Sequence, residues 1–257
     1  MDVFNPWSNA SEWSNGIPPE IHPPDAEVLT LLLNEVKRDR MLVLEVGSWV
    51  GNGSTRVIVE AIRDVGGTLY CVDTWRGSDN VKHHQRYREH YKDMFAVFRD
   101  NVRASRADEM VKPLVAPSTE ASKRFRDGTF DLIFIDGNHA YSQAKQDILT
   151  WLPKVRFGGI LCGHDCDADY ATLDDNLRSE IERHGEEDVL HNTSSPGPPA
   201  FHPGVVKAVH EIFGGKAKLW LESKPTTIWS YQRARPRGVL GLVRSLFRKR
   251  AALARVH

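Results

Sequence analysis

Two short polar loops carry the residues of this 257-residue sequence that are best suited to chemistry. The first loop contains Asp136 and His139, and the second contains His164 and Asp165. Each loop follows an apolar, strand-like stretch, so the two sets of side chains are expected at one edge of a sheet. Mg²⁺ and similar hard ions take carboxylate oxygens together with water and substrate oxygens. Asp136 and Asp165 are therefore predicted to bind a divalent ion.

The two histidines leave more than one role open. His164 could be a third ligand or a residue behind the ion, because imidazole suits zinc or iron better than Mg²⁺. His139 lies just past Asp136, where it could accept the proton of a hydroxyl that a metal has made more acidic. Any one of these residues alone would also fit a loop cap or a surface histidine. Their combination favours a site.

A glycine-rich stretch, MLVLEVGSWVGNGSTR at residues 41–56, indicates a second part of the same site. Its apolar run predicts a buried strand that delivers Glu45 at its end, and Ser54 can begin a helix. Three glycines would let the backbone turn tightly and approach a ligand, although many α/β turns need glycine merely to turn. These glycines are Gly47, Gly51 and Gly53.

An acidic residue also ends the next predicted strand. The segment TLYCVDTW predicts a strand that finishes at Asp73. An acid at this point can bind the hydroxyl pair of a ribose, but it can also only cap a loop. Because two successive strands each end in a special residue, the sequence favours nucleotide-type binding.

Strand-like and helix-like segments alternate along most of the chain. Strands are predicted at residues 41–46, 68–73, 110–115, 129–135, 158–162, 218–221 and 226–231, and helices at 25–37, 54–62, 142–152 and 205–213. This alternation indicates an α/β fold with an open, doubly wound sheet. Ligands of such sheets bind at the carboxyl ends of the strands. The polar residues predicted there are Glu45, Asp73, Ser118, Asp136 and Asp165.

Two further expectations concern the predicted helices, and one of them leaves two roles open. Asp25 is expected to cap the first helix. Residues 81–106 predict a long basic and aromatic helical stretch that contains His83, His84 and His90. This stretch could line a pocket for a polar or anionic substrate, or it could be a solvated helix whose aromatic side chains pack inward.

The bulk composition excludes several classes of protein. The 34 basic and 34 acidic side chains balance, which gives no reason to expect a nucleic-acid partner. Three sparse cysteines fit a reducing compartment, and neither a signal peptide nor an apolar run long enough for a membrane span is evident. We therefore expect a cytoplasmic protein.

The chain is predicted to contain one main domain with three appendages. We expect an N-terminal arm at residues 1–24, a domain at 25–233 with a lid-like insertion at 166–203, and a tail at 234–257. Trp7 and Trp13 of the arm could form a flap. The tail is a basic amphipathic helix that could lie on an anionic membrane surface or dock on another subunit, and we expect a homo-oligomer, such as a dimer.

The chain resembles class I S-adenosylmethionine-dependent methyltransferases, in particular the branch that acts on sugars and other small hydroxylated natural products. The matching motifs are VLEVGSWVGNGST, LYCVDTW, APSTEAS and FDLIFIDGNHAYSQAKQDILTWLPKVRFGGILCGHD, with PGVVKAVHEIF and TIWSY after them. They cover most of residues 41–231, and the block at 130–165 is the most specific. The resemblance implies a Rossmann-like, mostly parallel, seven-stranded sheet whose last strand is antiparallel.

The same resemblance implies roles for individual residues. The methionine part of the cofactor would lie against the glycine loop, its ribose against Asp73, and its adenine against Ser118 and Thr119. The implied cofactor-binding residues are Glu45, Gly47, Gly51, Ser54, Asp73, Ser118 and Thr119. The implied metal ligands are Asp136, His164 and Asp165, although an acid is more usual at the position of His164. His139 matches the general base of related sugar methyltransferases, and Asp136 would act with it.

The predicted reaction is in-line transfer of a sulfonium methyl group to a hydroxyl of a saccharide or another polyhydroxylated metabolite. A divalent ion, with Mg²⁺ the first choice, would acidify the hydroxyl. The alternatives are O-methylation of a catechol-like or other small aromatic acceptor, a non-catalytic cofactor-binding or membrane-surface protein, and a nicotinamide dehydrogenase. The wider glycine spacing and Glu45 count against the dehydrogenase.

Overall fold

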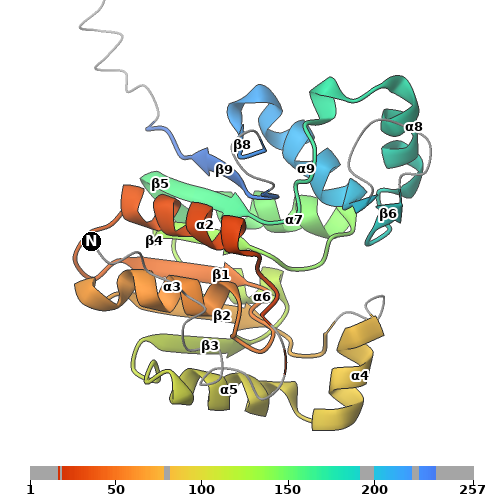
Figure 1. Ribbon diagram of the computed structural model, residues 1–257. Helices are drawn as coiled ribbons and strands as arrows, with labels where there is room; N and C mark the ends of the chain where they lie inside the picture. The colour runs from red at the N-terminus through yellow and green to blue at the C-terminus, as the bar shows by residue number, and fades with distance from the viewer. Residues whose placement is uncertain (1–16, 18, 78–81, 192–199, 222–225, 236–257) are drawn as a thin grey trace, which may run out of the picture.

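The computed structural model describes residues 17, 19–77, 82–191, 200–221 and 226–235. Its centre is a seven-stranded sheet in the order β3-β2-β1-β4-β5-β9-β8 (Figure 1). Strands β1 to β5 are parallel, whereas β9 is antiparallel to both β5 and β8. The strands are β1 (Leu42–Val46), β2 (Thr68–Asp73), β3 (Val111–Val115), β4 (Phe130–Ile135), β5 (Val155–Gly163), β8 (Lys218–Leu219) and β9 (Trp229–Gln232). The predicted doubly wound sheet with an antiparallel last strand is confirmed.

Helices cover both faces of this sheet (Figure 1). The helices are α2 (Pro23–Glu35), α3 (Ser54–Ile62), α4 (Lys82–Tyr91), α5 (Met94–Ala104), α6 (Ser118–Ser122), α7 (Tyr141–Trp151), α8 (Asp175–His184) and α9 (Pro203–Phe213). A short hairpin of β6 (Leu190–His191) and β7 (Ala200–Phe201) lies apart from the main sheet. No helix among the described residues is long and apolar enough to cross a membrane.

Alternating strand side chains build two apolar layers. Val43 belongs to the layer that includes α2, α3 and α5, whereas its neighbour Leu44 belongs to the layer that includes α7, α8 and α9. A strand buried on both faces needs an uninterrupted apolar run. The segment FDLIFI of β4 is buried at every position, and its one charged residue, Asp131, is paired with Arg38 and Arg156.

The expected helix cap at Asp25 is wrong. Helix α2 follows His22, whose side chain makes no capping hydrogen bond, and Asp25 lies inside the first turn with 1% of its surface exposed. Its Oδ1 accepts the backbone N–H of Thr227 at 2.9 Å. Asp25 therefore joins α2 to the segment before β9 and is held at the sheet edge.

The long helical stretch expected at residues 81–106 is two helices. Lys92 between them has a φ of +63°, and Asp93 caps α5 by accepting the N–H of Ala96 at 2.9 Å. A left-handed residue followed by a capping side chain ends one helix and begins the next. The side chain of His83 lies outside the described part of the structure.

The appendages are described only in part. Ile17 and Ile21, at the end of the N-terminal arm, are buried in the layer that contains α2 and α3. The insertion contains α8 and the β6–β7 hairpin. Trp7, Trp13, residues 192–199 and the predicted tail helix at 236–257 lie outside the described residues. The domain boundaries and the lid-like insertion stay predictions.

The glycine loop after β1 makes one very close backbone contact. Gly47 has a φ of +84°, and a Cβ atom there would lie 1.8 Å from the carbonyl oxygen of Asp136. Only glycine fits, because both the conformation and the space exclude a side chain. The loops that follow β1 and β4 are thus pressed together, which fixes Asp136 beside the glycine loop.

We predict that Gly47→Ala lowers the free energy of unfolding by at least about 3 kcal/mol, since the added atom would push against backbone. Gly66→Ala is the matched control, because Gly66 has a φ of +60° but nothing within 4 Å of a Cβ atom. That variant should lose only the cost of a left-handed alanine, about 1–2 kcal/mol. Urea denaturation measures both. Equal losses would show that the contact with Asp136 is unimportant.

Candidate active site

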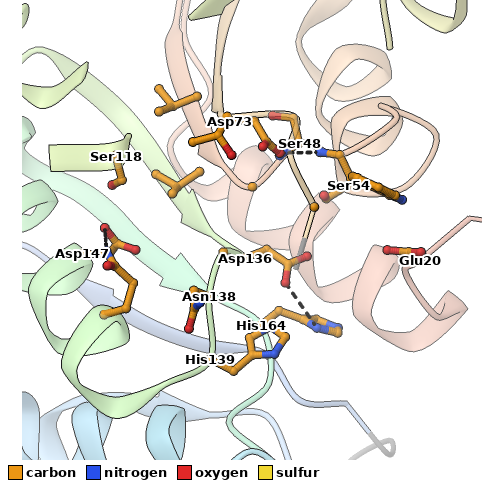
Figure 2. Close-up of a pocket in the computed structure, with 18 of the residues that line it drawn as sticks. Glu20, Ser48, Ser54, Asp73, Ser118, Asp136, Asn138, His139, Asp147 and His164 are labelled. Carbon is orange, nitrogen blue, oxygen red and sulfur yellow. Dashed lines mark hydrogen bonds and ion pairs between the residues drawn. The ribbon is translucent and has the colours of Figure 1, made fainter. Parts of the chain in front are cut away.

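A cavity of about 480 Å³ opens at the carboxyl ends of the parallel strands. Figure 2 shows Ser48, Ser54 and Asp73 on one side of it and His139 and His164 on another. The predicted site residues that line the cavity are Gly47, Ser54, Asp73, Ser118, Thr119, Asp136, His139, His164 and Asp165. The structure thus brings together most of the side chains that the sequence singles out.

The carboxylate of Asp73 organises the glycine loop. Its Oδ2 accepts the backbone N–H groups of Ser48 at 3.0 Å and Trp49 at 2.8 Å, and its Oδ1 accepts the N–H of Trp75 at 2.7 Å. Asp73 therefore does act as a loop cap, one of its two expected roles. It also lines the cavity, which is compatible with the other expected role.

Two predicted cofactor-binding residues do not line the cavity. Gly51 faces α5 instead, where a Cβ atom would lie 2.9 Å from the ring of Phe98. Glu45 is fully buried beneath the glycine loop and accepts the hydroxyl of Thr55 at 2.5 Å. Burial raises the pKa of Glu45 despite such hydrogen bonds. Its second oxygen, Oε1, lacks a hydrogen-bond partner among the described residues.

The opposite end of the cavity lies under α6 and α7. Ser118 accepts the indole N–H of Trp151 at 2.7 Å, which fixes the hydroxyl at the start of α6. Gln143 and Asp147, both from α7, also line this end and are joined by a 3.2 Å hydrogen bond, and Figure 2 shows Asp147 there. The sequence analysis missed this pair. Its signal is the i, i+4 spacing, which places both side chains on one helix face.

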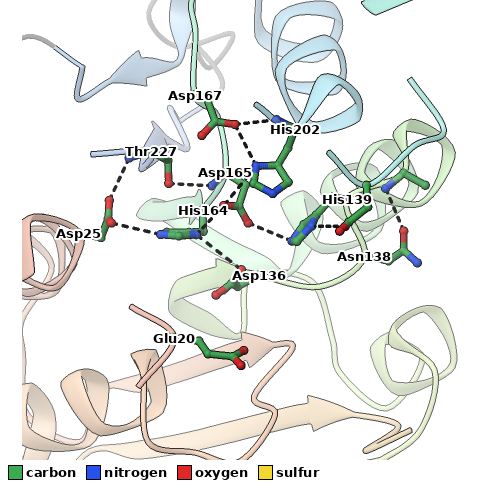
Figure 3. Close-up of polar contacts among 12 residues, drawn as sticks. Glu20, Asp25, Asp136, Asn138, His139, His164, Asp165, Asp167, His202 and Thr227 are labelled. Carbon is green, nitrogen blue, oxygen red and sulfur yellow. Dashed lines mark hydrogen bonds and ion pairs between the residues drawn. The ribbon is translucent and has the colours of Figure 1, made fainter. Parts of the chain in front are cut away.

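Asp165 is the centre of the acid and histidine cluster (Figure 3). Its Oδ2 lies 2.9 Å from Nε2 of His139, and its Oδ1 lies 2.9 Å from Nδ1 of His164 and 3.5 Å from Nδ1 of His202. Asp165 is 8% exposed and has a φ of +63°, a conformation that few residues other than glycine adopt. Such backbone strain is typical of functional positions.

Each of the three histidines also contacts a second acid (Figure 3). His139 Nδ1 lies 2.7 Å from Asp188 Oδ1, and His164 Nε2 lies 3.3 Å from Asp25 Oδ2. His202 Nδ1 lies 2.9 Å from Asp167 Oδ2. These pairs orient the three rings around Asp165.

The sequence analysis missed Asp188 and His202. Asp188 lies between α8 and β6, and no local pattern marks it. His202 directly precedes α9, whose Gly204 packs so closely that a Cβ atom would lie 2.2 Å from the carbonyl oxygen of His139. A Pro-Gly pair after a histidine was therefore a usable signal that the start of a helix approaches another loop.

The charges within the cluster shift one another strongly. Burial disfavours a charged His139, but Asp165 and Asp188 outweigh it and raise the pKa of His139 to about 10. Burial, assisted by the Asp165 charge, raises the pKa of Asp136 to about 7 despite the neighbouring histidines. Asp165 behaves oppositely, because its contacts with His164 and His139 overcome burial and hold its pKa well below the usual range.

The residues around Asp165 fit a divalent cation. Asp136, His164 and Asp165 each offer a ligand atom within 4.8 Å of the others. Histidines that bind metals usually have a carboxylate behind their second ring nitrogen, and Asp25 lies 3.3 Å from Nε2 of His164 as an ion pair, without a hydrogen bond among the described residues. The three predicted ligands thus lie together with a suitable partner behind the histidine.

The helix predicted to line a pocket contributes one side chain to the outer wall. His84 of α4 lines the cavity, with Nε2 3.3 Å from Oε2 of Glu20 and its ring centroid 4.1 Å from that of Trp49. α4 therefore approaches the side that carries the glycine loop. His90 is absent from the residues that line the cavity.

Comparison with known proteins finds a similarity in the central part of the chain. Residues 44–166 match a family model described as a methyltransferase domain. The chain is also 30% identical over 105 residues to an uncharacterised protein of Sinorhizobium fredii. That match covers 41% of this chain but only 11% of the relative's length.

Solved structures agree with this result at the level of the fold. A Corynebacterium glutamicum protein is 14% identical, with a TM-score of 0.55 over 93% of this chain and 94% of that one. The S-adenosylhomocysteine-bound methyltransferase PaMTH1 of Podospora anserina is 16% identical, with a TM-score of 0.56 over 91% of this chain and 89% of that one. Residues 44–166 thus resemble a methyltransferase domain, and the strand order of the sheet agrees with the fold that these solved structures share with this chain.

Proposed function

We propose that this protein is an S-adenosylmethionine-dependent O-methyltransferase that acts on a hydroxyl of a saccharide or another polyhydroxylated metabolite. The observation that carries the proposal is the composition of the single cavity, which joins the glycine loop to the cluster around Asp165. The methyltransferase domain match supports the chemistry, and the S-adenosylhomocysteine in PaMTH1 supports the cofactor.

The cofactor is assigned to the part of the cavity between the glycine loop and α7. Gly47 brings the loop backbone against Asp136, so a ligand there would lie beside the acid cluster. Asp73 is positioned to receive the ribose hydroxyls, and Ser118 and Thr119 border the region left for adenine. Glu45 does not line the cavity, so it would not contact the cofactor directly. It would instead position the glycine loop through its hydrogen bond with Thr55.

Asp136, His164 and Asp165 are proposed to hold a divalent ion. When bound, such an ion would orient the acceptor hydroxyl and lower its pKa. Oxygen ligands from two aspartates suit Mg²⁺ or Mn²⁺. Asp25 holds His164 from the opposite side of its ring, so the nitrogen that faces Asp136 and Asp165 is Nδ1.

His139 is the proposed proton acceptor, and Asp136 is the acid that adjoins it. With Asp165 and Asp188 on its two ring nitrogens, His139 is protonated near neutral pH. His139 can take a proton only when Asp165 is engaged elsewhere as a ligand, because the carboxylate then no longer stabilises the imidazolium. The substrate oxygen gains the methyl group, its proton passes to Nε2 of His139, and S-adenosylhomocysteine leaves.

The cavity wall favours a polyhydroxylated acceptor over an aromatic one. Apart from histidines, Trp49 is the one aromatic residue among the described residues that line the cavity, and it belongs to the glycine loop. The acceptor side presents Asn138, His139 and His202. A sugar hydroxyl has a high pKa, so it would need both the ion and the base.

Methyl transfer should be measured with labelled S-adenosylmethionine against panels of saccharide and catechol acceptors. We predict activity on saccharides, and an at least about 100-fold lower kcat for His139→Gln, because that variant loses the proton acceptor. Cofactor affinity should be unchanged. His184→Gln, at a histidine paired with Glu187 away from the cavity, is the control. Near-normal turnover by His139→Gln would refute its role.

Removal of metal provides a separate prediction. Chelation should abolish methyl transfer, and Mg²⁺ or Mn²⁺ should restore it. Asp25→Asn should raise the Mg²⁺ concentration for half-maximal rate about 10–100-fold, because the amide keeps an acceptor for Thr227 but no longer orients His164 as a carboxylate does. Asp100→Asn, at an exposed carboxylate of α5, should match the wild type. An unchanged rate after chelation would exclude the ion.

A further inference from the structure

A second group of possible ligands shares Asp165 with the first. His139, Asp165 and His202 each offer an atom within 4.8 Å of the others. The rings of His139 and His202 lie 4.5 Å apart between centroids, with their planes at 68°. The first group is rich in oxygen, whereas this one has two imidazoles and one carboxylate.

Both histidines of this second group also contact another acid, although Asp167 contacts the same nitrogen of His202, Nδ1, that lies 3.5 Å from Asp165. Asp188 contacts Nδ1 of His139 at 2.7 Å, which leaves Nε2 directed at Asp165. Asp167 accepts the backbone N–H of His202 at 2.7 Å and also lies 2.9 Å from its Nδ1. Carboxylates that hold histidine rings in this way are typical of metal sites.

The backbone fixes the distance between the two histidines. Gly204, two residues after His202, packs against the carbonyl oxygen of His139, where a Cβ atom would lie only 2.2 Å away. This contact holds the start of α9 against the loop after β4. The two rings are therefore brought together by packing, before any ligand arrives.

We propose that His139, Asp165 and His202 form a second cation site, one that takes a borderline ion such as Zn²⁺ and thereby inhibits the enzyme. Two imidazoles and a carboxylate suit Zn²⁺ better than Mg²⁺. The inhibitory consequence rests on the proposed function, because an ion on Nε2 of His139 would occupy the atom that accepts the proton. The binding itself does not depend on that function.

The two sites can be filled together because Asp165 presents different oxygens to His164 and His139, whereas His202 lies 3.5 Å from the oxygen that faces His164. Oδ1 lies 2.9 Å from His164, and Oδ2 lies 2.9 Å from His139. Carboxylate-bridged pairs of ions are common in enzymes, at separations of about 3.5–4 Å. Zinc would therefore add to the first ion and need not replace it.

The number of Zn²⁺ ions bound per chain should be measured on the metal-free, full-length protein by calorimetry and elemental analysis. Zn²⁺ alone is the probe. We expect two ions per chain in the wild type, one in His202→Gln and one in Asp136→Asn. His184→Gln should bind two. One ion or none in the wild type, or two in His202→Gln, would overturn the site.

Activity tests the inhibitory role separately. In excess Mg²⁺, zinc should inhibit methyl transfer by the wild type, and His202→Gln should need at least about tenfold more zinc for the same inhibition. Equal sensitivity would refute the inhibitory role. If no acceptor is methylated, the proposed function fails, but the zinc count still decides whether the site exists.

A measurement on the wild type covers the case in which His202→Gln does not fold. X-ray absorption of protein loaded with excess Mg²⁺ and one equivalent of Zn²⁺ should show two imidazole ligands at about 2.0–2.1 Å. One imidazole would place the zinc at His164 instead, and none would place it outside the cluster. Either result would overturn the proposal.

Discussion

The site depends on one buried carboxylate that three imidazoles share. Asp165 contacts His139, His164 and His202, and its own N–H donates to the hydroxyl of Thr227 at 3.1 Å. These contacts draw together the loop after β4, the end of β5, the start of α9 and the segment before β9. Asp165 is thus a buried carboxylate that joins four segments of the fold at this edge of the sheet.

When no cation is bound, the protons of the histidine rings balance the negative charge of Asp165. The pKa values of His139 and His164 are raised, with Asp165 the largest favourable influence on each, although burial opposes the charge. The pKa of Asp165 is depressed in return. A cation would take over the charge balance that the imidazolium protons now provide, so binding of metal and release of protons are coupled. Such coupling would allow one set of residues to hold an ion and also supply a base, as proposed.

The sequence predicted the parts of the site that lie at strand ends. Asp136, His164 and Asp165 follow apolar strands directly, so the parallel sheet alone brings them together. Gly47 was predicted to permit a close approach, and the structure places the backbone of Asp136 in that space. The seven-stranded fold followed from the same alternation of segments together with the resemblance to methyltransferases.

The parts that escaped prediction depend on packing between distant segments. Asp188 lies in the segment predicted to be an insertion, and its contact with His139 spans 49 positions of the chain. Asp25 fits the pattern of a helix cap, yet tertiary contacts with Thr227 and His164 decide its place. Gly51 belongs to the predicted cofactor loop, but the ring of Phe98 covers it. Local patterns contain no information on which distant partner fills such a space.

The most direct test of this account is a crystal structure with S-adenosylhomocysteine and Mn²⁺. We predict an anomalous peak within bonding distance of Asp136, His164 and Asp165, with the cofactor between the glycine loop and α7 and its sulfur directed toward His139. A manganese peak away from Asp165, or a cofactor bound outside the cavity, would contradict the assignment of one site to both components.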